Sequence, residues 1–219
     1  VALILSSLRV GPKTIAAGLL HDVLEDCGVP RAELAKAFDD EVATLVESVT
    51  KIGNIEFKDE KEYLAVNHRK IFIAMAKDIR VILIKLVDRL HNMRTLRYMP
   101  PEKQKKIASE TLEVYAPIAH RLGISEIKNE LEDLSFYYLY PEKYREIARM
   151  VDQRKAERDA QVALMIQEIG EVLTQQGIQY RIFGRSKHLY SIYKKMTTKG
   201  KRFEEILDLH AIRIITLSD

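Results

Sequence analysis

The stretch HDVLED, residues 21–26, gathers side chains that can bind a metal ion or transfer a proton, namely His21, Asp22, Glu25 and Asp26. The apolar residues around them recur at helical spacing, so at about 100° per residue the polar side chains are expected on one side of a single helical turn. No Lys or Arg lies between Lys13 and Arg31, which leaves this patch anionic. The pattern favours a metal or acid-base site, and the alternative is an acidic helix end.

A second carboxylate, Asp88, lies within one of the most apolar segments of the chain. A buried carboxylate is costly unless it pairs with a cation, binds a metal or becomes neutral. On a helix Arg89 points about 100° away, so it is not an obvious partner. Asn92 and Thr95 follow Asp88 at i+4 and i+7 and continue one polar stripe that suits a bound ligand. The alternative is a core ion pair of Asp88 with Arg89 or Lys85.

Together, the His-Asp pair and the distant Asp88 resemble the later ligands of HD-type metal-dependent phosphohydrolases, whose pattern is His, then His-Asp, then Asp, on a bundle of helices. The sequence around these residues resembles a particular family more closely. Six stretches resemble the hydrolase domain of the RelA/SpoT homologues, which are long bifunctional enzymes that make and degrade the alarmone (p)ppGpp. These stretches are GLLHDVLEDC, VTKI, NHRK, IAMAKDIRVILIKLVDRLHNMRTL, ETLEVYAPIAHRLGI and ELEDLSFYYL. YRIFGRSKHLYSIYKKM and RFEEILDLHAIRIIT resemble the start of the synthetase domain of the same family.

This resemblance implies a role for each polar residue of the first segment. His21, Asp22 and Asp88 would bind a metal ion, which is typically manganese in the family. Mixed His and carboxylate ligation fits manganese without excluding zinc, iron or magnesium. Glu25 and Asp26 would activate water or protonate the leaving group. The nucleotide would be held by Asn92, Thr95 and, with weaker support, Lys105. The reaction would convert (p)ppGpp to GDP or GTP and pyrophosphate.

In the second segment the resemblance implies an ATP site. Lys187, Ser191 and Lys195 are spaced i, i+4 and i+8, so one face of the expected helix would present two ammonium groups and a hydroxyl to a triphosphate. The spacing alone also describes an ordinary solvated helix face. By resemblance, Arg185 would contact the adenine and Asp208 would bind Mg²⁺. This site would pass the β,γ-pyrophosphate of ATP to the 3′-hydroxyl of GDP or GTP.

Periodicity and helix breakers predict a mainly α chain in two parts. Residues 1–140 are expected to form an all-helical domain, the HD-type hydrolase domain of the resemblance. Residues 141–219 are expected to form a charged helical connection and the start of an α/β, nucleotidyltransferase-like synthetase domain. Within this second part the expected elements are a strand at 178–183, a helix at 185–196 and a β-rich run at 209–216.

The family's first metal ligand, a histidine a little more than twenty residues before the His-Asp pair, does not occur in this sequence. The second acidic residue and the guanine-stacking tyrosine of the synthetase site are expected beyond Asp219. We therefore expect a segment truncated at both ends, with one or both activities incomplete. A second reading is a non-catalytic helical module that binds nucleotide or transmits a signal on the same scaffold. The intact HDVLED favours the catalytic reading, because the synthetase-only branch of the family has typically lost that motif.

Composition agrees with this assignment. The chain carries 35 basic and 32 acidic residues, so its net charge is small. A small net charge does not favour binding to a nucleic acid or to a membrane surface. Cys27 is the only cysteine, which suits a reducing cytoplasm. The opening VALILSSL is too short to span a membrane and is expected to form a core helix. The expected partners are guanine nucleotides, (p)ppGpp and ATP, with a ribosome contacted only through regions outside this chain. His68, His91 and His120 are expected to be structural.

Overall fold

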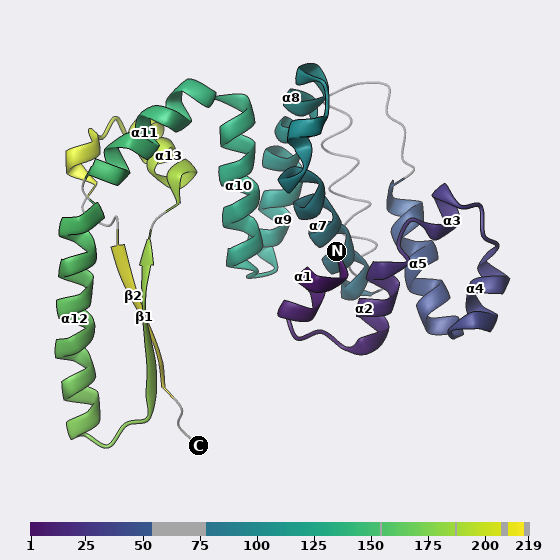
Figure 1. The fold of residues 1–219 in the computed structure, drawn as a ribbon, viewed down its shortest axis with the longest axis horizontal. Coiled ribbons are helices and arrows are strands. Elements are labelled where there is room, and N and C mark those ends of the chain that lie inside the picture. Colours follow the sequence, from purple (N-terminus) through teal and green to yellow (C-terminus); the bar gives the residue numbers. More distant parts are fainter. Residues whose placement is uncertain (54–77, 154, 187, 207–209, 217–219) are drawn as a thin grey trace. The chain divides into compact units, whose positions relative to one another are not determined.

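The structure is a computed structural model that describes residues 1–53, 78–153, 155–186, 188–206 and 210–216. The chain divides into two compact units, Val1–Ser135 and Phe136–Asp219 (Figure 1). No helix in the described part of the chain is both long enough and apolar enough to cross a membrane.

The described residues of the first unit form helices that are joined by short turns and connections. Its elements are α1 (Ala2–Ser7), α2 (Pro12–Leu19), α3 (Val23–Asp26), α4 (Arg31–Ala37), α5 (Asp40–Gly53), α7 (Ile79–Arg94), the 3₁₀ turn η1 (Leu96–Tyr98), α8 (Pro101–Glu110), the π-helical turn η2 (Thr111–Tyr115), α9 (Ala116–Arg121) and α10 (Ser125–Leu139), which ends in the second unit. The opening segment therefore forms a helix, and its Leu5 is fully buried, as the sequence predicted.

Helix α7 forms much of the core of this unit. It begins at the N-cap residue Asp78, whose carboxylate accepts a hydrogen bond from the Arg80 backbone N–H at 2.9 Å. The helix packs against α1, α2 and α5. Its buried apolar residues are Val81, Ile82, Ile84, Leu86, Val87, Leu90 and Met93. Burying one such side chain stabilises the fold by about 1.5–3 kcal/mol. The packing of α7 therefore fixes the position of the one carboxylate that this helix buries, Asp88.

The second unit joins helices to a two-stranded antiparallel sheet. Its elements are α11 (Pro141–Gln153), α12 (Lys155–Gln175), β1 (Tyr180–Ser186), α13 (Leu189–Lys199), the 3₁₀ turn η3 (Phe203–Glu205) and β2 (His210–Thr216). The register places Ile182 opposite Ile214, and α12 contacts both strands (Figure 1). A separate core contains Phe136, Ile147, Ile192, Phe203 and Ile206.

The strand, helix and strand of this unit occur in the predicted order, but the predicted boundaries of the first strand and of the helix were wrong. The predicted helix at 185–196 begins only at Leu189, because Arg185 and Ser186 continue β1 and pair with Ala211 and His210. The ladder to β2 thus extends the strand past Gly184 as far as Ser186.

Candidate metal centre

His21 and Asp22 lie in the turn between α2 and α3, so the prediction of one continuous helical turn was wrong. The backbone of Leu20 leaves the helical region at φ −100° and ψ 6°, and its carbonyl accepts a hydrogen bond from the Val23 N–H at 3.0 Å. The chain then starts a new helix at Val23. As a result the His21 side chain is only 12% exposed, whereas that of Asp22 is 54% exposed.

The break brings His21 against Asp88, which lies 67 positions further along the chain. Its Nε2 atom is 2.9 Å from Asp22 Oδ2 and 3.3 Å from Asp88 Oδ1. Asp88 Oδ1 also accepts a hydrogen bond from Asn92 Nδ2 at 3.0 Å, and Asp88 Oδ2 accepts one from Lys85 Nζ at 3.1 Å. The structure therefore brings the three expected ligands together and places Asn92 beside them.

These contacts determine the protonation of the site. Burial alone would raise the pKa of Asp88, but the hydrogen bond from His21 and the charge of Lys85 outweigh it and lower that pKa to about 2. The hydrogen bond to Asp88 raises the pKa of His21, although burial acts in the opposite direction. The other ring nitrogen, His21 Nδ1, is buried and has no hydrogen-bond partner among the described residues. Asp88 is therefore negatively charged at physiological pH.

A cavity of about 360 Å³ opens beside these groups. Its polar lining comes from His21, Asp22, Asp88, His91 and Asn92, and its apolar lining includes residues of α1 and α2. His91, which was expected to be structural, is an exposed residue that lines this cavity. Its position at i+3 from Asp88 was the available signal in the sequence, since i+3 and i+4 residues share a helix face.

Other expected site residues lie away from this lining. Glu25 and Asp26 are exposed on α3 and do not line the cavity. Thr95 Oγ1 donates hydrogen bonds to the His91 and Asn92 carbonyls at 3.2 and 3.3 Å, so its hydroxyl proton is used at the end of α7. Lys105 is exposed on α8. The roles assigned to these residues remain predictions.

Arg89 does not pair with Asp88. Arg89 Nη1 is 3.2 Å from Glu110 Oε2, and the guanidinium carbon of Arg89 is 4.1 Å from the ring centroid of Tyr115. The alternative prediction was an ion pair of Asp88 with Arg89 or Lys85. Asp88 forms this ion pair with Lys85. Lys85 is thus the basic residue at the site, and the signal for it was its i−3 spacing from Asp88.

The donor set suits a divalent cation. One imidazole nitrogen and two carboxylates are ligands for manganese, iron, zinc or magnesium. Neighbouring ligands of an octahedral ion at about 2.1 Å lie about 3 Å apart, which is close to the spacing between His21 Nε2 and the two carboxylates. Within the described ranges no group of three or more His, Cys, Asp or Glu residues is arranged so that it could hold a metal ion. Here His21 Nε2 shares a hydrogen bond with Asp88 and lies 2.9 Å from Asp22 Oδ2, and Asp88 also pairs with Lys85.

The expected ATP site is described only in part. Lys187 and Asp208 lie outside the described residues, and of Arg185 only the backbone is described, in β1. Ser191 and Lys195 lie one turn apart on α13, and both are half-buried. The expected cluster of phosphate ligands therefore stays a prediction.

Comparisons with known proteins place both segments in families. Residues 1–125 match the family model described as HD domain, and residues 184–219 match the one described as a region found in RelA/SpoT proteins. The chain is 48% identical over 215 residues to the bifunctional (p)ppGpp synthase/hydrolase SpoT of Escherichia coli K12, which covers 98% of this chain and 31% of that relative.

Two further relatives carry names for the two separate activities. A probable guanosine-3′,5′-bis(diphosphate) 3′-pyrophosphohydrolase of Synechocystis is 48% identical over 219 residues, 100% of this chain and 29% of the relative. A GTP pyrophosphokinase of Streptomyces coelicolor is 48% identical over 215 residues, 98% of this chain and 25% of the relative. The chain therefore spans 25–31% of the length of these relatives. It belongs to the HD-domain family, and its match to the RelA/SpoT region and its identity to SpoT make it a homologue of the RelA/SpoT proteins.

Proposed function

We propose that the chain belongs to a bifunctional alarmone enzyme and carries its metal-dependent (p)ppGpp hydrolase site together with the start of its synthetase. The observation that carries this proposal is the meeting of His21, Asp22 and Asp88, from two segments far apart in the sequence, at one cavity. The names of the relatives supply (p)ppGpp as the substrate of hydrolysis and GTP as a substrate of synthesis, and ATP would be the donor of the pyrophosphate.

In the hydrolase, His21, Asp22 and Asp88 would hold the metal ion, which we propose to be Mn²⁺. A bound divalent ion lowers the pKa of its water to near neutral and offsets negative charge on the phosphate under attack. Asp88 enters this role already ionised, because its pKa is about 2. The amide of Asn92, which donates to Asp88 Oδ1, sets the orientation of the carboxylate and can turn its carbonyl to the nucleotide.

The remaining hydrolase residues would act on the substrate. We propose that Glu25 and Asp26 transfer the proton to or from the water and the leaving pyrophosphate, and that Thr95 and Lys105 contact the nucleotide. In the synthetase, Arg185 would contact the adenine of ATP and Asp208 would bind Mg²⁺. The ATP phosphates would be held by Lys187, Ser191 and Lys195, which together offset charge on the transferring group.

A specific observation favours a second candidate, a helical module without hydrolase activity. Lys85 already pairs with Asp88, and such a cation can satisfy a buried carboxylate without a metal. The deciding experiment is Mn²⁺ binding by calorimetry to the wild type, to Asp88→Asn and to the control Asp40→Asn. Asp40 is a suitable control because it pairs with Arg31, away from the cavity.

The catalytic proposal expects Mn²⁺ binding in the wild type and in Asp40→Asn, and its loss in Asp88→Asn with the helical fold intact. The same three variants are then assayed for (p)ppGpp hydrolysis in a longer chain that carries the family's first histidine. Normal hydrolysis by Asp88→Asn would show that Asp88 is a structural residue and that the metal assignment is wrong.

A further inference from the structure

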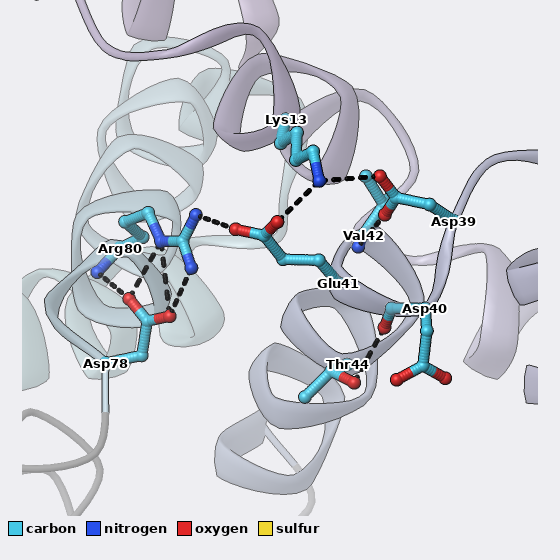
Figure 2. Close-up of polar contacts among 8 residues, drawn as sticks. All are labelled: Lys13, Asp39, Asp40, Glu41, Val42, Thr44, Asp78 and Arg80. Atoms are coloured by element: carbon cyan, nitrogen blue, oxygen red, sulfur yellow. Dashed lines mark hydrogen bonds and ion pairs between the residues drawn. The ribbon is translucent and has the colours of Figure 1, made fainter.

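A charged cluster lies where helices α2, α5 and α7 begin, outside the cavity (Figure 2). At its centre Glu41, in the first turn of α5, contacts a cation from each neighbouring helix. Glu41 Oε2 is 2.5 Å from Lys13 Nζ of α2, and Glu41 Oε1 is 2.6 Å from Arg80 Nη1 of α7. One carboxylate thus joins α2 to α7, and we call Lys13, Glu41 and Arg80 the Glu41 bridge.

Both cations of the Glu41 bridge are also held by a second acid. Lys13 Nζ is 2.8 Å from Asp39 Oδ2, and Asp39 Oδ1 accepts a hydrogen bond from the Val42 N–H at 2.7 Å, which fixes it to the start of α5. Arg80 Nη2 is 2.7 Å from Asp78 Oδ2, on the residue that caps α7 (Figure 2). The bridge is therefore tied to the backbone at the beginning of two helices.

The two helices joined by the Glu41 bridge are those that lead to His21 and Asp88. Lys13 lies in the first turn of α2, and His21 follows just after the end of that helix. Arg80 lies in the first turn of α7, and Asp88 follows about two turns later, or about 12 Å along the helix axis. Helices α2, α5 and α7 contact one another in every pairing. The pair α2 and α7 is thus linked at one end by Glu41 and at the other by His21 and Asp88.

We propose that Glu41 is a positioning residue for the metal site: it holds α2 against α7 in the alignment that brings His21 Nε2 to Asp88. The inference deepens the proposed function and rests on it for the identity of the ion. Salt bridges with this exposure, 42% for Glu41 and 48% for Lys13, add little to the free energy of unfolding, so the bridge acts mainly on alignment.

A competing role for Glu41 is simply favourable placement of an acid at the N-terminus of α5. Asp40 shares that role, because it too lies in the first turn of α5. It contacts Arg31 of α4, however, and not α2 or α7. The variants Glu41→Gln and Asp40→Asn are therefore a matched pair, since each exchanges one acid for its amide in the same helical turn and only the first breaks the bridge.

The experiment measures three quantities in the full 219-residue chain with each variant: Mn²⁺ affinity by calorimetry, thermal unfolding, and amide hydrogen exchange at His21 in the metal-free protein. We expect Glu41→Gln to weaken Mn²⁺ binding about threefold to fivefold and to speed exchange at His21. We expect Asp40→Asn to leave both unchanged, with similar unfolding temperatures for the two variants. The spectrum of bound Mn²⁺ in electron paramagnetic resonance should change in Glu41→Gln alone.

Equal effects of the two substitutions, or none from Glu41→Gln, would overturn the positioning role. A lower unfolding temperature for Glu41→Gln with unaltered Mn²⁺ affinity and exchange would do so as well, since it would show a purely structural residue. If the wild type binds no Mn²⁺, the proposed function fails. Hydrogen exchange at His21 in the metal-free chain then still decides whether Glu41 aligns the two helices.

Discussion

At the scale of single residues, Asp88 shows how a buried charge is accommodated. Its carboxylate has a contact on each oxygen, from Lys85 and Asn92 on its own helix and from His21 after α2. Removing one partner from such a group usually costs more than the contact itself contributes, because the others remain buried with an unsatisfied charge. The carboxylate is therefore fixed in place by neighbours at i−3 and i+4, and the approach of α2 adds the contact with His21.

The acid at the start of α7 gives a prediction on pH. The hydrogen bond from Arg80 lowers the pKa of Asp78 below its usual value of 3.8, although burial opposes this. A carboxylate with a lowered pKa stabilises the fold above its unfolded pKa, and this contribution is lost as the pH falls through the folded pKa. We expect the free energy of unfolding to fall more steeply in the wild type than in Arg80→Gln as the pH drops from about 5 to about 3.

Urea unfolding at several pH values across that range measures the two slopes. The carboxyls of Asp39 and Glu41, whose pKa values the hydrogen bond from Lys13 lowers, add to the slope in both proteins. The difference between the curves therefore reports Arg80 and its two acids, Asp78 and Glu41. Parallel curves would show that the Arg80 contacts do not persist in solution.

A second prediction at this scale concerns Glu25 and Asp26. If they transfer protons and do not bind the metal, the double variant Glu25→Gln, Asp26→Asn should keep its Mn²⁺ affinity but lose turnover by about a hundredfold or more. Both residues are exposed on α3, outside the cavity lining, so the change should barely affect the fold. Calorimetry and steady-state hydrolysis separate the roles: loss of Mn²⁺ binding would make them metal ligands, and normal turnover would exclude them from the reaction.

At the scale of secondary-structure elements, one irregularity follows from a proline. Residues 101–121 are helical throughout but widen into the π-helical turn η2 at Thr111–Tyr115. Pro117 follows in α9; it lacks an N–H, and its ring would collide with the carbonyl of Glu113 in a regular α-helix. A wider turn just before the proline relieves that collision. It also places Tyr115 under the guanidinium of Arg89, which ties this helical run to α7.

Gly184 gives a prediction on how α12 packs against the sheet. It lies within β1 opposite Ile212, and a Cβ atom added there would meet Val162 Cγ1 of α12 at 2.6 Å. A glycine inside a strand marks such a close approach. We expect Gly184→Ala to lower the free energy of unfolding by about 1–3 kcal/mol, despite the better strand propensity of alanine.

The compensating variant Val162→Ala removes the colliding atom, so the two changes should couple favourably in a double-mutant cycle followed by urea unfolding. Additive effects would show that α12 and β1 are further apart in solution than in the structure.

These elements also show what the sequence could predict. The apolar periodicity of α7 and the β-rich sequence of β2 were strong enough to predict both elements. The position of the carboxylate of Asp88 in an apolar segment predicted that this residue has a partner. The break at Leu20 was not predictable, because the nearest glycine, Gly18, lies inside α2, where Leu5 of α1 approaches it closely. The end of β1 was misplaced because Gly184 reads as a turn residue, whereas its role depends on Val162 of a distant helix. Partners far apart in sequence, such as Glu41 with Lys13 and Arg80, leave no local signal.

At the scale of the whole molecule, the chain has two units with separate cores. The first is built on α7 and its helical neighbours, and the second has the core that contains Phe136 and Ile192. The proposed hydrolase ligands all belong to the first unit, and the described residues of the proposed ATP site, Ser191 and Lys195, belong to the second. Each site therefore depends on the packing of its own unit for its local geometry.

This division predicts that the two activities can be removed separately in a chain long enough to carry both. Lys195→Ala would delete the proposed phosphate contact of that residue. A charge-assisted contact to a transferring group is typically worth about 2–4 kcal/mol, so this variant should lose most pyrophosphate transfer while hydrolysis continues. Asp22→Ala would delete a proposed metal ligand and should abolish hydrolysis while synthesis continues, so this variant should accumulate alarmone from ATP and GDP. Both reactions are assayed on both variants, with circular dichroism to establish folding. A folded variant that has lost both activities would show that the two sites depend on each other. If the sites were independent, a local change in one unit would leave the reaction at the site of the other unit unaffected.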